Sequence, residues 1–178
     1  MSRYSSRQTE LILSARKTLE SKTPLQSDCG ALCNAACCHG DAGMWLFPGE
    51  DALYADLPGF SVISADGNEG YPFLLCSHAA DACPRVSRPL SCRIFPLFPY
   101  VTRTPFGSYR IRAAVDPRAA RICPLLSDES APEIDPRFRL AVERVGRRLM
   151  RDREMRKYLI KTSDFLRDIA EVQGRLEK

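Results

Sequence analysis

All eight cysteines and all thirteen prolines of this 178-residue chain fall between Pro24 and Pro136. Proline removes a backbone donor and clashes with the preceding helical turn, so this interval cannot hold long helices. We therefore expect short elements joined by turns, in a middle region that buries little apolar surface. A metal centre would supply the missing stability there, because metal-binding energy is also folding energy.

The cysteines fall into two groups and one isolated residue. The first group is Cys29-x3-Cys33-x3-Cys37-Cys38, and the second is Cys76-x6-Cys83-x8-Cys92, expected on turns around Pro84 and Pro89. Thiolates are the ligands of zinc, copper(I) and iron–sulfur clusters. The pattern predicts a metal centre whose candidate ligands are Cys29, Cys33, Cys37, Cys38, Cys76, Cys83, Cys92 and Cys123.

Helical spacing gives the first group a physical meaning. Residues four apart on a helix are offset by only about 40°, so a helical turn over 32–37 would put Cys33 and Cys37 on one stripe. Cys29 would lie at or just before that turn. Cys38 lies about 100° further round, where it reaches a different ligand position or faces the core.

The number of thiols leaves the metal open. Four thiolates suffice for a tetrahedral zinc or one four-iron cluster, and eight would allow two sites. The chain has no C-x2-C pair of the kind that zinc ribbons use, so the spacing favours an iron–sulfur cluster, 4Fe–4S first, over zinc. His39 and His78 are either further ligands or ordinary histidines. Arg88 and Arg93 flank Cys92 and either donate to metal-bound sulfur or form surface salt bridges.

The composition favours a cytoplasmic protein. The chain is 44% hydrophobic and 27% charged, with a net charge of +4, and no run approaches the roughly 18 apolar residues of a membrane span. Residues 1–22 lack the unbroken apolar core of a secretory signal. Cytoplasmic thiols stay reduced, so we favour metal binding over disulfides, which remain the alternative.

Helices are expected in both flanks. Residues 6–22 form an amphipathic pattern that ends at Pro24. Asp135-Pro136 is typical of an N-cap followed by proline at the first helical position. Apolar residues then recur through two or three helices, with another start at Thr162 or Ser163. In the middle, residues 44–47, 71–75 and 108–115 predict strands, and residues 49–55 predict a short helix.

These elements predict an α+β fold with a small, irregular, cysteine-rich and metal-stabilised core and short strands. N-terminal and C-terminal helices flank that core. We expect a single domain over residues 1–178. Its N-terminal helix lies within 1–24, its cysteine-cluster metal-binding core covers 25–134, and its C-terminal helices cover 135–178.

A string of residues around Cys92 carries a resemblance to a known family. Tyr71-Pro-Phe-Leu, Cys83 and Arg88-Pro-x-x-Cys92-Arg-x-Phe95-Pro, after the Cys37-Cys38 pair, resemble the CxxCxxCC or YkgJ-type cysteine-cluster family, described as a zinc- or iron-chelating domain. The resemblance covers residues 29–125, and Cys123-Pro124 is also similar. It implies zinc or iron–sulfur binding by these cysteines, without an assigned reaction. A longer branch, the flagellin lysine methylases, methylates lysine, but this chain has no glycine-rich segment for the methyl donor.

This chain departs from the family pattern at three places. The first cluster is spaced C-x3-C-x3-C-C rather than C-x2-C-x2-C-C, and Tyr71 stands where the family has a cysteine. The interval between Cys83 and Cys92 is one residue shorter than is usual. Cys76, five residues after Tyr71, is a candidate replacement ligand.

We therefore expect a metal–thiolate protein with a redox, metal-handling or scaffold role. Its partner would be a metal ion or cluster, with a protein partner left open and no membrane. One alternative is a nucleic-acid-binding module with a structural zinc, because basic residues dominate the last helices; a solvated basic face is the favoured explanation. The other alternative is a metal-dependent protein-modifying enzyme. The basic residues are Arg137, Arg139, Arg144, Arg147, Arg148, Arg151, Arg153, Arg156, Lys157 and Lys161.

Overall fold

The computed structural model describes residues 6–27, 29–38, 43–64, 71–77, 85–126 and 133–176. The helices within these ranges are α1 Ser6–Thr18, α2 Cys29–Leu32, α3 Leu90–Ile94, α4 Pro136–Leu149 and α5 Arg153–Leu176. The strands are β1 Gly43–Trp45, β2 Phe60–Ser64, β3 Pro72–Cys76, β4 Leu97–Arg103 and β5 Tyr109–Val115. Single 3-10 turns cover Ala36–Cys38, Asp51–Leu53, Arg85–Ser87, Pro117–Arg121 and Pro124–Leu126. The expected α+β fold with helices in both flanks is confirmed.

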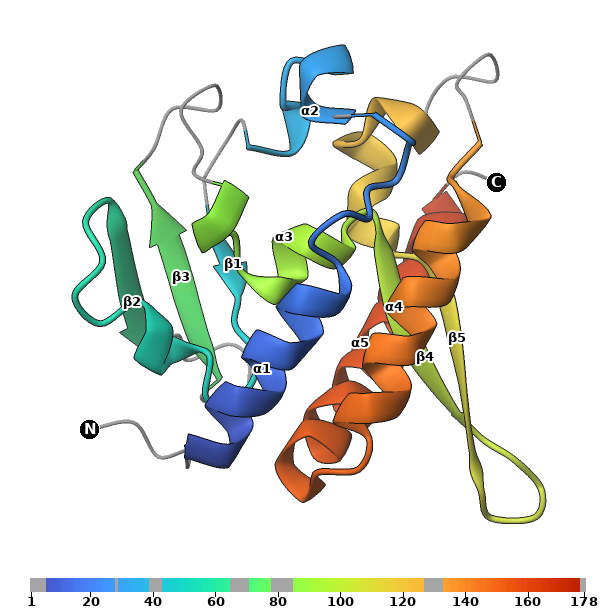
Figure 1. Cartoon of the computed structure of the whole chain (residues 1–178). Coiled ribbons are helices and arrows are strands. Elements are labelled where there is room, and N and C mark those ends of the chain that lie inside the picture. The colour runs from blue at the N-terminus through green and yellow to red at the C-terminus, as the bar shows by residue number, and fades with distance from the viewer. Residues whose placement is uncertain are drawn as a thin grey trace.

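Two small antiparallel sheets make up the β structure. One has three strands in the order β1-β3-β2, and the other is the β4–β5 hairpin. Figure 1 shows the three-stranded sheet on the left and the hairpin on the right, with α1 and α4 running between them. Strands β1, β3 and β5 match the segments that the sequence predicted. Strands β2 and β4 were missed, β4 because Pro99 lies inside it.

Pro99 is tolerated because of its place in the hairpin register. It pairs with Ala113, whose N–H points outward to Glu143 Oε1 at 3.4 Å. Pro99 therefore lies at a position where no ladder hydrogen bond is required of it. Helix α4 crosses the hairpin closely here, since a Cβ on Gly146 would lie 2.6 Å from Pro99 Cβ. Only glycine permits this approach.

Side chains of the two long helices cover both edges of the hairpin. On the β5 edge, Glu143 accepts from the Ala113 N–H and Arg139 donates to the Ala113 carbonyl at 2.8 Å. On the β4 edge, Val101 N donates to Ser163 Oγ at 2.9 Å, and Arg167 donates to the Val101 carbonyl. Covered edges resist pairing with strands of other molecules. The same bonds fix α4 and α5 against the hairpin.

The helix starts follow capping chemistry. Asp135 caps α4 by accepting from Arg137 N at 2.8 Å, with Pro136 at the first helical position, as predicted. Asp152 caps α5 by accepting from Glu154 N and Met155 N at 3.0 and 3.1 Å. The predicted start at Thr162 or Ser163 is wrong. Both residues lie inside α5, where the Ser163 hydroxyl donates to the Leu159 carbonyl at 2.6 Å.

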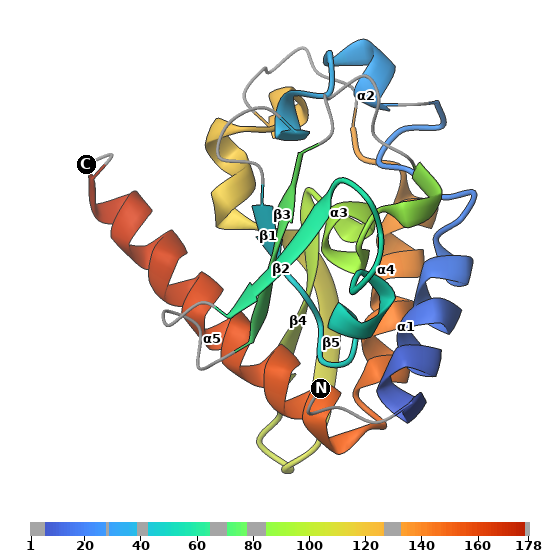
Figure 2. The same ribbon diagram turned by 90° about the vertical axis from the view of Figure 1, so that its left-hand side faces the viewer.

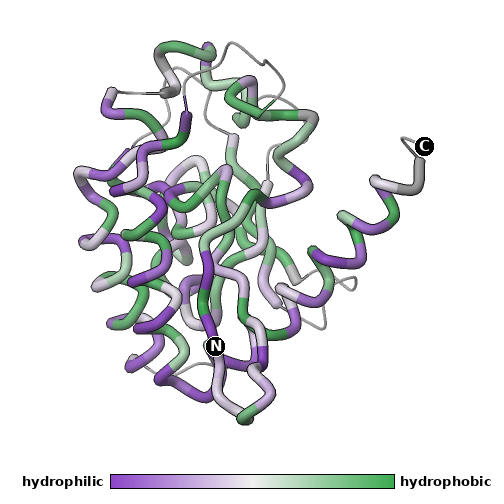
Figure 3. The backbone as a smooth tube through the Cα atoms, turned by 90° about the vertical axis from the view of Figure 1, so that its right-hand side faces the viewer, coloured by the Kyte–Doolittle hydropathy of each residue, from purple (hydrophilic) through white to green (hydrophobic). Residues whose placement is uncertain are grey.

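One hydrophobic cluster joins both flanks to the middle region. Hydrophilic and hydrophobic residues alternate along the helices in Figure 3, as expected for helices with one packed face. The expectation that the middle buries little apolar surface is wrong, because α3 and the hairpin pack directly against the helices. The middle contributes Phe47, Tyr71, Leu90, Ile94, Leu97, Phe98, Val101, Ile111 and Ala113 to this cluster.

No helix in the described part of the chain is both long enough and apolar enough to span a lipid bilayer. The longest, α5, has polar residues along one side and runs beyond the body of the molecule at its C-terminal end (Figure 2).

Candidate metal centre

Cys92 lies on α3, a short helix with one buried face. Leu90 and Ile94, four residues apart on the same side, are 0% and 2% exposed. Cys92 lies between them in sequence and so points away from that face, where it is half-buried. Pro89 in an extended conformation precedes the helix, and Phe95 returns the chain to an extended path after it. The turn expected here is therefore a helix.

A buried acid holds the start of α3. Glu50 is 0% exposed, and its Oε1 accepts from Leu90 N at 2.7 Å and from Arg16 Nη2 at 2.8 Å. Its Oε2 accepts from Phe47 N at 3.1 Å. Arg16 also donates to the Tyr54 hydroxyl at 2.5 Å, which in turn donates to the Ser87 carbonyl at 2.7 Å. This network ties α1 to the segment that carries Cys92.

Arg93 has a structural role. Its Nε donates to the Arg88 carbonyl at 2.9 Å, and its Nη2 donates to the carbonyls of Arg85 and Val86 at 2.9 and 2.8 Å. These bonds fold the Arg85–Ser87 turn back onto α3. Desolvation by burial lowers the pKa of Arg93. In the described part of the chain, the hydrogen bonds given for Arg93 are donated to backbone carbonyls and not to sulfur or to a carboxylate.

The first cysteine group does not form the continuous helical turn that was expected. Helix α2 covers only Cys29–Leu32 and so ends where the predicted turn over 32–37 would begin. Asn34 and Ala35 both have φ of +49°, in the left-handed region, before a 3-10 turn resumes at Ala36–Cys38. Each such residue costs on the order of 1 kcal/mol. Backbone strain of this kind is often found at functional sites.

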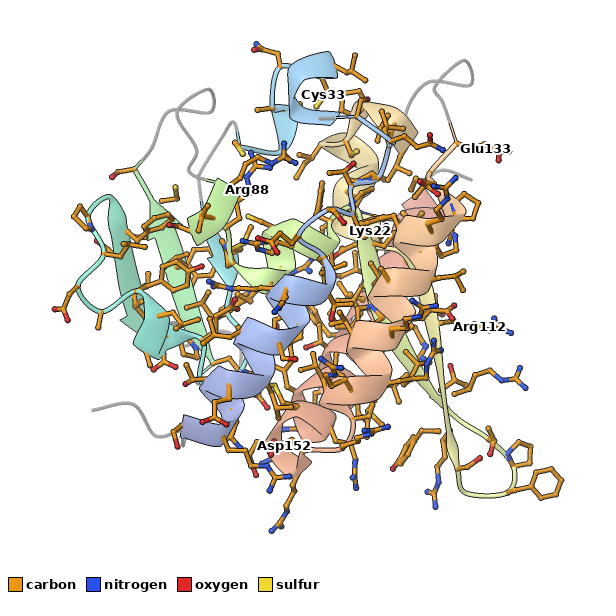
Figure 4. The ribbon with its side chains drawn as sticks, in the orientation of Figure 1. Lys22, Cys33, Arg88, Arg112, Glu133 and Asp152 are labelled. Atoms are coloured by element: carbon orange, nitrogen blue, oxygen red, sulfur yellow. The ribbon has the colours of Figure 1, made fainter. Side chains whose placement is uncertain are left out.

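The first cavity brings distant cysteines together. It has a volume of about 310 Å³, and its walls include Cys33, Cys37, Cys92 and Cys123. These residues come from three separate parts of the chain: the segment after α2, helix α3, and the approach to the last 3-10 turn. Figure 4 shows Cys33 at the same end of the molecule as Arg88 and Lys22, with Asp152 at the opposite end.

Two further cavities adjoin the same thiols. Cys37, Cys38, Cys92 and Arg88 line a second cavity of about 310 Å³ and a third of about 60 Å³. The third also contains Cys76. Cys37, Cys92 and Arg88 thus line all three cavities. Arg88 therefore lies where it can offset negative charge on sulfur.

Met44 adds a sulfur that the sequence analysis missed. Its Sδ lies 3.1 Å from Cys92 Sγ, because β1 runs past α3. Thioether and thiolate sulfur are both soft donors. An isolated methionine carries no recognisable signal in the sequence, so only the packing of β1 against α3 identifies it.

The surroundings of two of these thiols, Cys37 and Cys123, raise their pKa values. A hydrogen bond to Cys38 is the largest cause that raises the pKa of Cys37, followed by desolvation and by the charges of Cys38, Cys92 and Cys33. Burial raises the pKa of Cys123. Thiolates gathered this closely repel one another, and a bound cation would remove that repulsion.

The described cysteines are thiols, and the site is not closed around a metal position. Cys33, Cys37, Cys38, Cys76, Cys92 and Cys123 form no disulfide with one another. Within the described ranges, no three His, Cys, Asp or Glu side chains are arranged as a metal-binding group. Cys83, His39 and His78 lie outside the described residues, and so does the side chain of Cys29. The cysteine sulfur atoms nevertheless suit a soft metal ion or a cluster, because thiols from separate segments line the same cavity.

Comparisons with protein-family models, with curated proteins and with solved structures found no match for this chain.

Proposed function

We propose that this chain is a metal–thiolate protein that holds an iron–sulfur cluster, or zinc, among its cysteines. The observation that carries the proposal is that Cys33, Cys37, Cys92 and Cys123 line one cavity, although up to ninety residues separate them in sequence. Three of these four thiols are exposed or half-buried, so apolar packing alone does not explain why they converge from three segments. Four thiolates match the ligand number of a [4Fe–4S] cluster or of a structural zinc.

The residues divide into candidate ligands and residues that hold them. Cys33, Cys37, Cys92 and Cys123 are the first candidates, and Cys38 and Cys76 are candidates beside the adjoining cavities. Bound metal would supply electron transfer if it is a cluster, or structural cross-linking if it is zinc. Because the described thiols are not yet arranged as ligands, we expect binding to draw the 29–38 segment toward α3 and to release protons. A cytoplasmic location, which keeps thiols reduced, accords with this function.

The test is the metal content of protein purified without oxygen. We expect a brown protein with broad visible absorption and iron matched by acid-labile sulfide. A colourless protein with stoichiometric zinc would show that the bound metal is zinc rather than iron, and the proposed metal site would stand. Protein that contains neither metal, and binds neither on reconstitution, would contradict the proposal.

A second candidate is a nucleic-acid-binding module with a structural metal. It is favoured by one observation: Arg144, Arg147 and Arg148 on α4 and Arg151 after it are exposed. Exposed arginines at helical spacing would contact phosphates.

A further inference from the structure

Two sulfur atoms from different elements meet beside the cysteine cavities. The Cys92 thiol on α3 donates to Met44 Sδ on β1, with the two sulfur atoms 3.1 Å apart. A hydrogen bond between their neighbours fixes this approach, because the Ser91 hydroxyl donates to the Trp45 carbonyl at 2.7 Å. Ser91 precedes Cys92 and Trp45 follows Met44, so α3 and β1 are joined directly beside the sulfur pair. The thiol and the thioether are therefore held together by the backbones of both elements.

The sulfur pair lies in the wall of the third cavity. The volume of this cavity, about 60 Å³, is a small fraction of the 310 Å³ of the first, which suits a single ion better than a cluster of several metal ions. In the described part of the chain, its wall has no carboxylate, amide or imidazole side chain. Carboxylate ligands favour magnesium, calcium and manganese, so this wall offers little to those ions. The residues of the wall that carry sulfur are Cys37, Cys38, Met44, Cys76 and Cys92.

We propose that the third cavity binds a monovalent soft metal ion, of the class of copper(I), between Cys92 and Met44. Thiolate and thioether sulfur select copper(I), whereas zinc is bound by thiolate, imidazole and carboxylate groups. Met44 is thus a metal ligand that favours one class of ion over another. Cys37 and Cys38 line the same wall and are the candidates for the remaining coordination positions.

The inference rests on the proposed metal–thiolate function and names the class of ion that one part of the site takes. Cys37 and Cys92 line the first cavity as well as the third. An ion in the third cavity and a metal centre in the first would therefore use the same thiols. For this reason, the test compares proteins that are purified in the same way and differ only at a methionine.

The first measurement compares metal affinities. Met44→Leu removes the thioether but conserves side-chain volume, so the fold should persist, which thermal melting checks. Full-length protein purified without oxygen is titrated with copper(I) against the chelator bicinchoninate, and with zinc against a zinc-binding dye. We expect Met44→Leu to bind copper(I) at least about tenfold more weakly, since loss of a residue that only supports a metal ligand already costs that much. The affinity for zinc should stay within about twofold, because zinc does not depend on a thioether.

Met155→Leu is the matched control. Met155 is 0% exposed in the main hydrophobic cluster and is not among the described residues that line the three cavities. The same change of side chain at this position should leave the affinities for copper(I) and zinc unchanged.

The second measurement observes the thioether directly. The chain has four methionines, whose methyl groups can be labelled with carbon-13 for NMR, and the signal that is missing in Met44→Leu identifies Met44. The probe is silver(I), a soft monovalent ion without unpaired electrons. We expect one equivalent of silver(I) to shift the Met44 methyl signal and to leave the Met155 signal in place.

The outcomes separate this inference from the function on which it rests. Equal copper(I) affinity of Met44→Leu and the unaltered protein, or an unmoved Met44 signal with silver(I) bound, would overturn the thioether ligand and leave the metal–thiolate function standing. An equal loss of copper(I) affinity in Met155→Leu would also overturn it, because the loss would not be specific to the cavity. A chain that binds none of copper(I), silver(I), zinc and iron would instead contradict the proposed function itself.

Discussion

Cys37 and Cys92 each line all three cavities at the cysteine-rich end of the molecule. They are held by different means. Cys92 stands on a helix anchored by two buried residues, whereas Cys37 follows two residues in the left-handed conformation. The charges of Cys33, Cys38 and Cys92 all act on the Cys37 thiol. At the scale of single residues, these two sulfurs are therefore the ones on which metal binding should depend most.

We expect Cys37→Ser and Cys92→Ser each to lose most of the bound metal. Both should also lower the melting temperature, because binding energy at this site is folding energy. Cys76→Ser is the matched control, since Cys76 lines only the smallest cavity and should retain more metal. Metal analysis and thermal melting of the three variants measure this. Full metal content and unchanged melting in both Cys37→Ser and Cys92→Ser would show that these cysteines are not ligands.

At the scale of elements, the Glu50 network joins three parts of the fold. Arg16 belongs to α1, Glu50 precedes the Asp51–Leu53 turn, and Leu90 begins α3. The ion pair between Arg16 and Glu50 is 2.8 Å long, with side chains 10% and 0% exposed. Removing one partner of a buried pair leaves an uncompensated buried charge, which costs more than the pair itself contributes.

Glu50→Gln should therefore lower the free energy of unfolding by about 3–5 kcal/mol. It should also reduce metal retention, because α3 loses a charged acceptor at Leu90 N. Asp164→Asn breaks an exposed ion pair, the 2.7 Å contact with Arg167, and should cost less than about 1 kcal/mol. Denaturant unfolding of the two variants compares the pairs directly. Equal costs in the two variants would mean that the Glu50 network is not the anchor of α3.

At the scale of the whole molecule, the basic residues of the last helices bear on whether the protein binds nucleic acid. Most arginines of α4 and Arg151 in the turn after it are exposed, as the spacing of Phe138, Val142, Val145 and Leu149 predicted, whereas Arg139 is half-buried. Two of these arginines already form polar contacts within the protein. Arg147 pairs with Glu143 at 3.2 Å, and Arg148 donates to Ser14. Such contacts favour a solvated basic face over one reserved for phosphates.

We therefore expect no specific nucleic-acid binding at physiological salt. If binding does occur, affinity should fall by about one power of salt concentration per phosphate contacted. Replacing Arg147, Arg148 and Arg151 by Gln should then lower both affinity and slope, with Arg103→Gln on the hairpin as a single-charge comparison. Binding assays across a salt series measure this. Submicromolar, sequence-selective binding would favour the nucleic-acid-binding function over the metal–thiolate function.

The sequence alone determined the elements that depend on local chemistry. The capped start of α4 at Asp135-Pro136, the amphipathic α1 and the alternating strand β5 were all predicted, because caps and periodicity act over a few residues. The sequence also singled out the cysteines as candidate ligands, although it did not show which of them line one cavity. Signals within a few residues of the chain were sufficient to predict these two helices and this strand.

Only the tertiary structure decided the rest, since it depends on contacts between distant segments. The break at Asn34–Ala35, the Glu50 network and the thioether of Met44 beside Cys92 have no local signature. Strand β4 escaped prediction because Pro99 is acceptable only in the register that the hairpin adopts. The middle region gains its stability from packing against α1, α4 and α5, which no count of its prolines could reveal. Burial and pairing are properties of the assembled chain, and they determine which of its thiols meet.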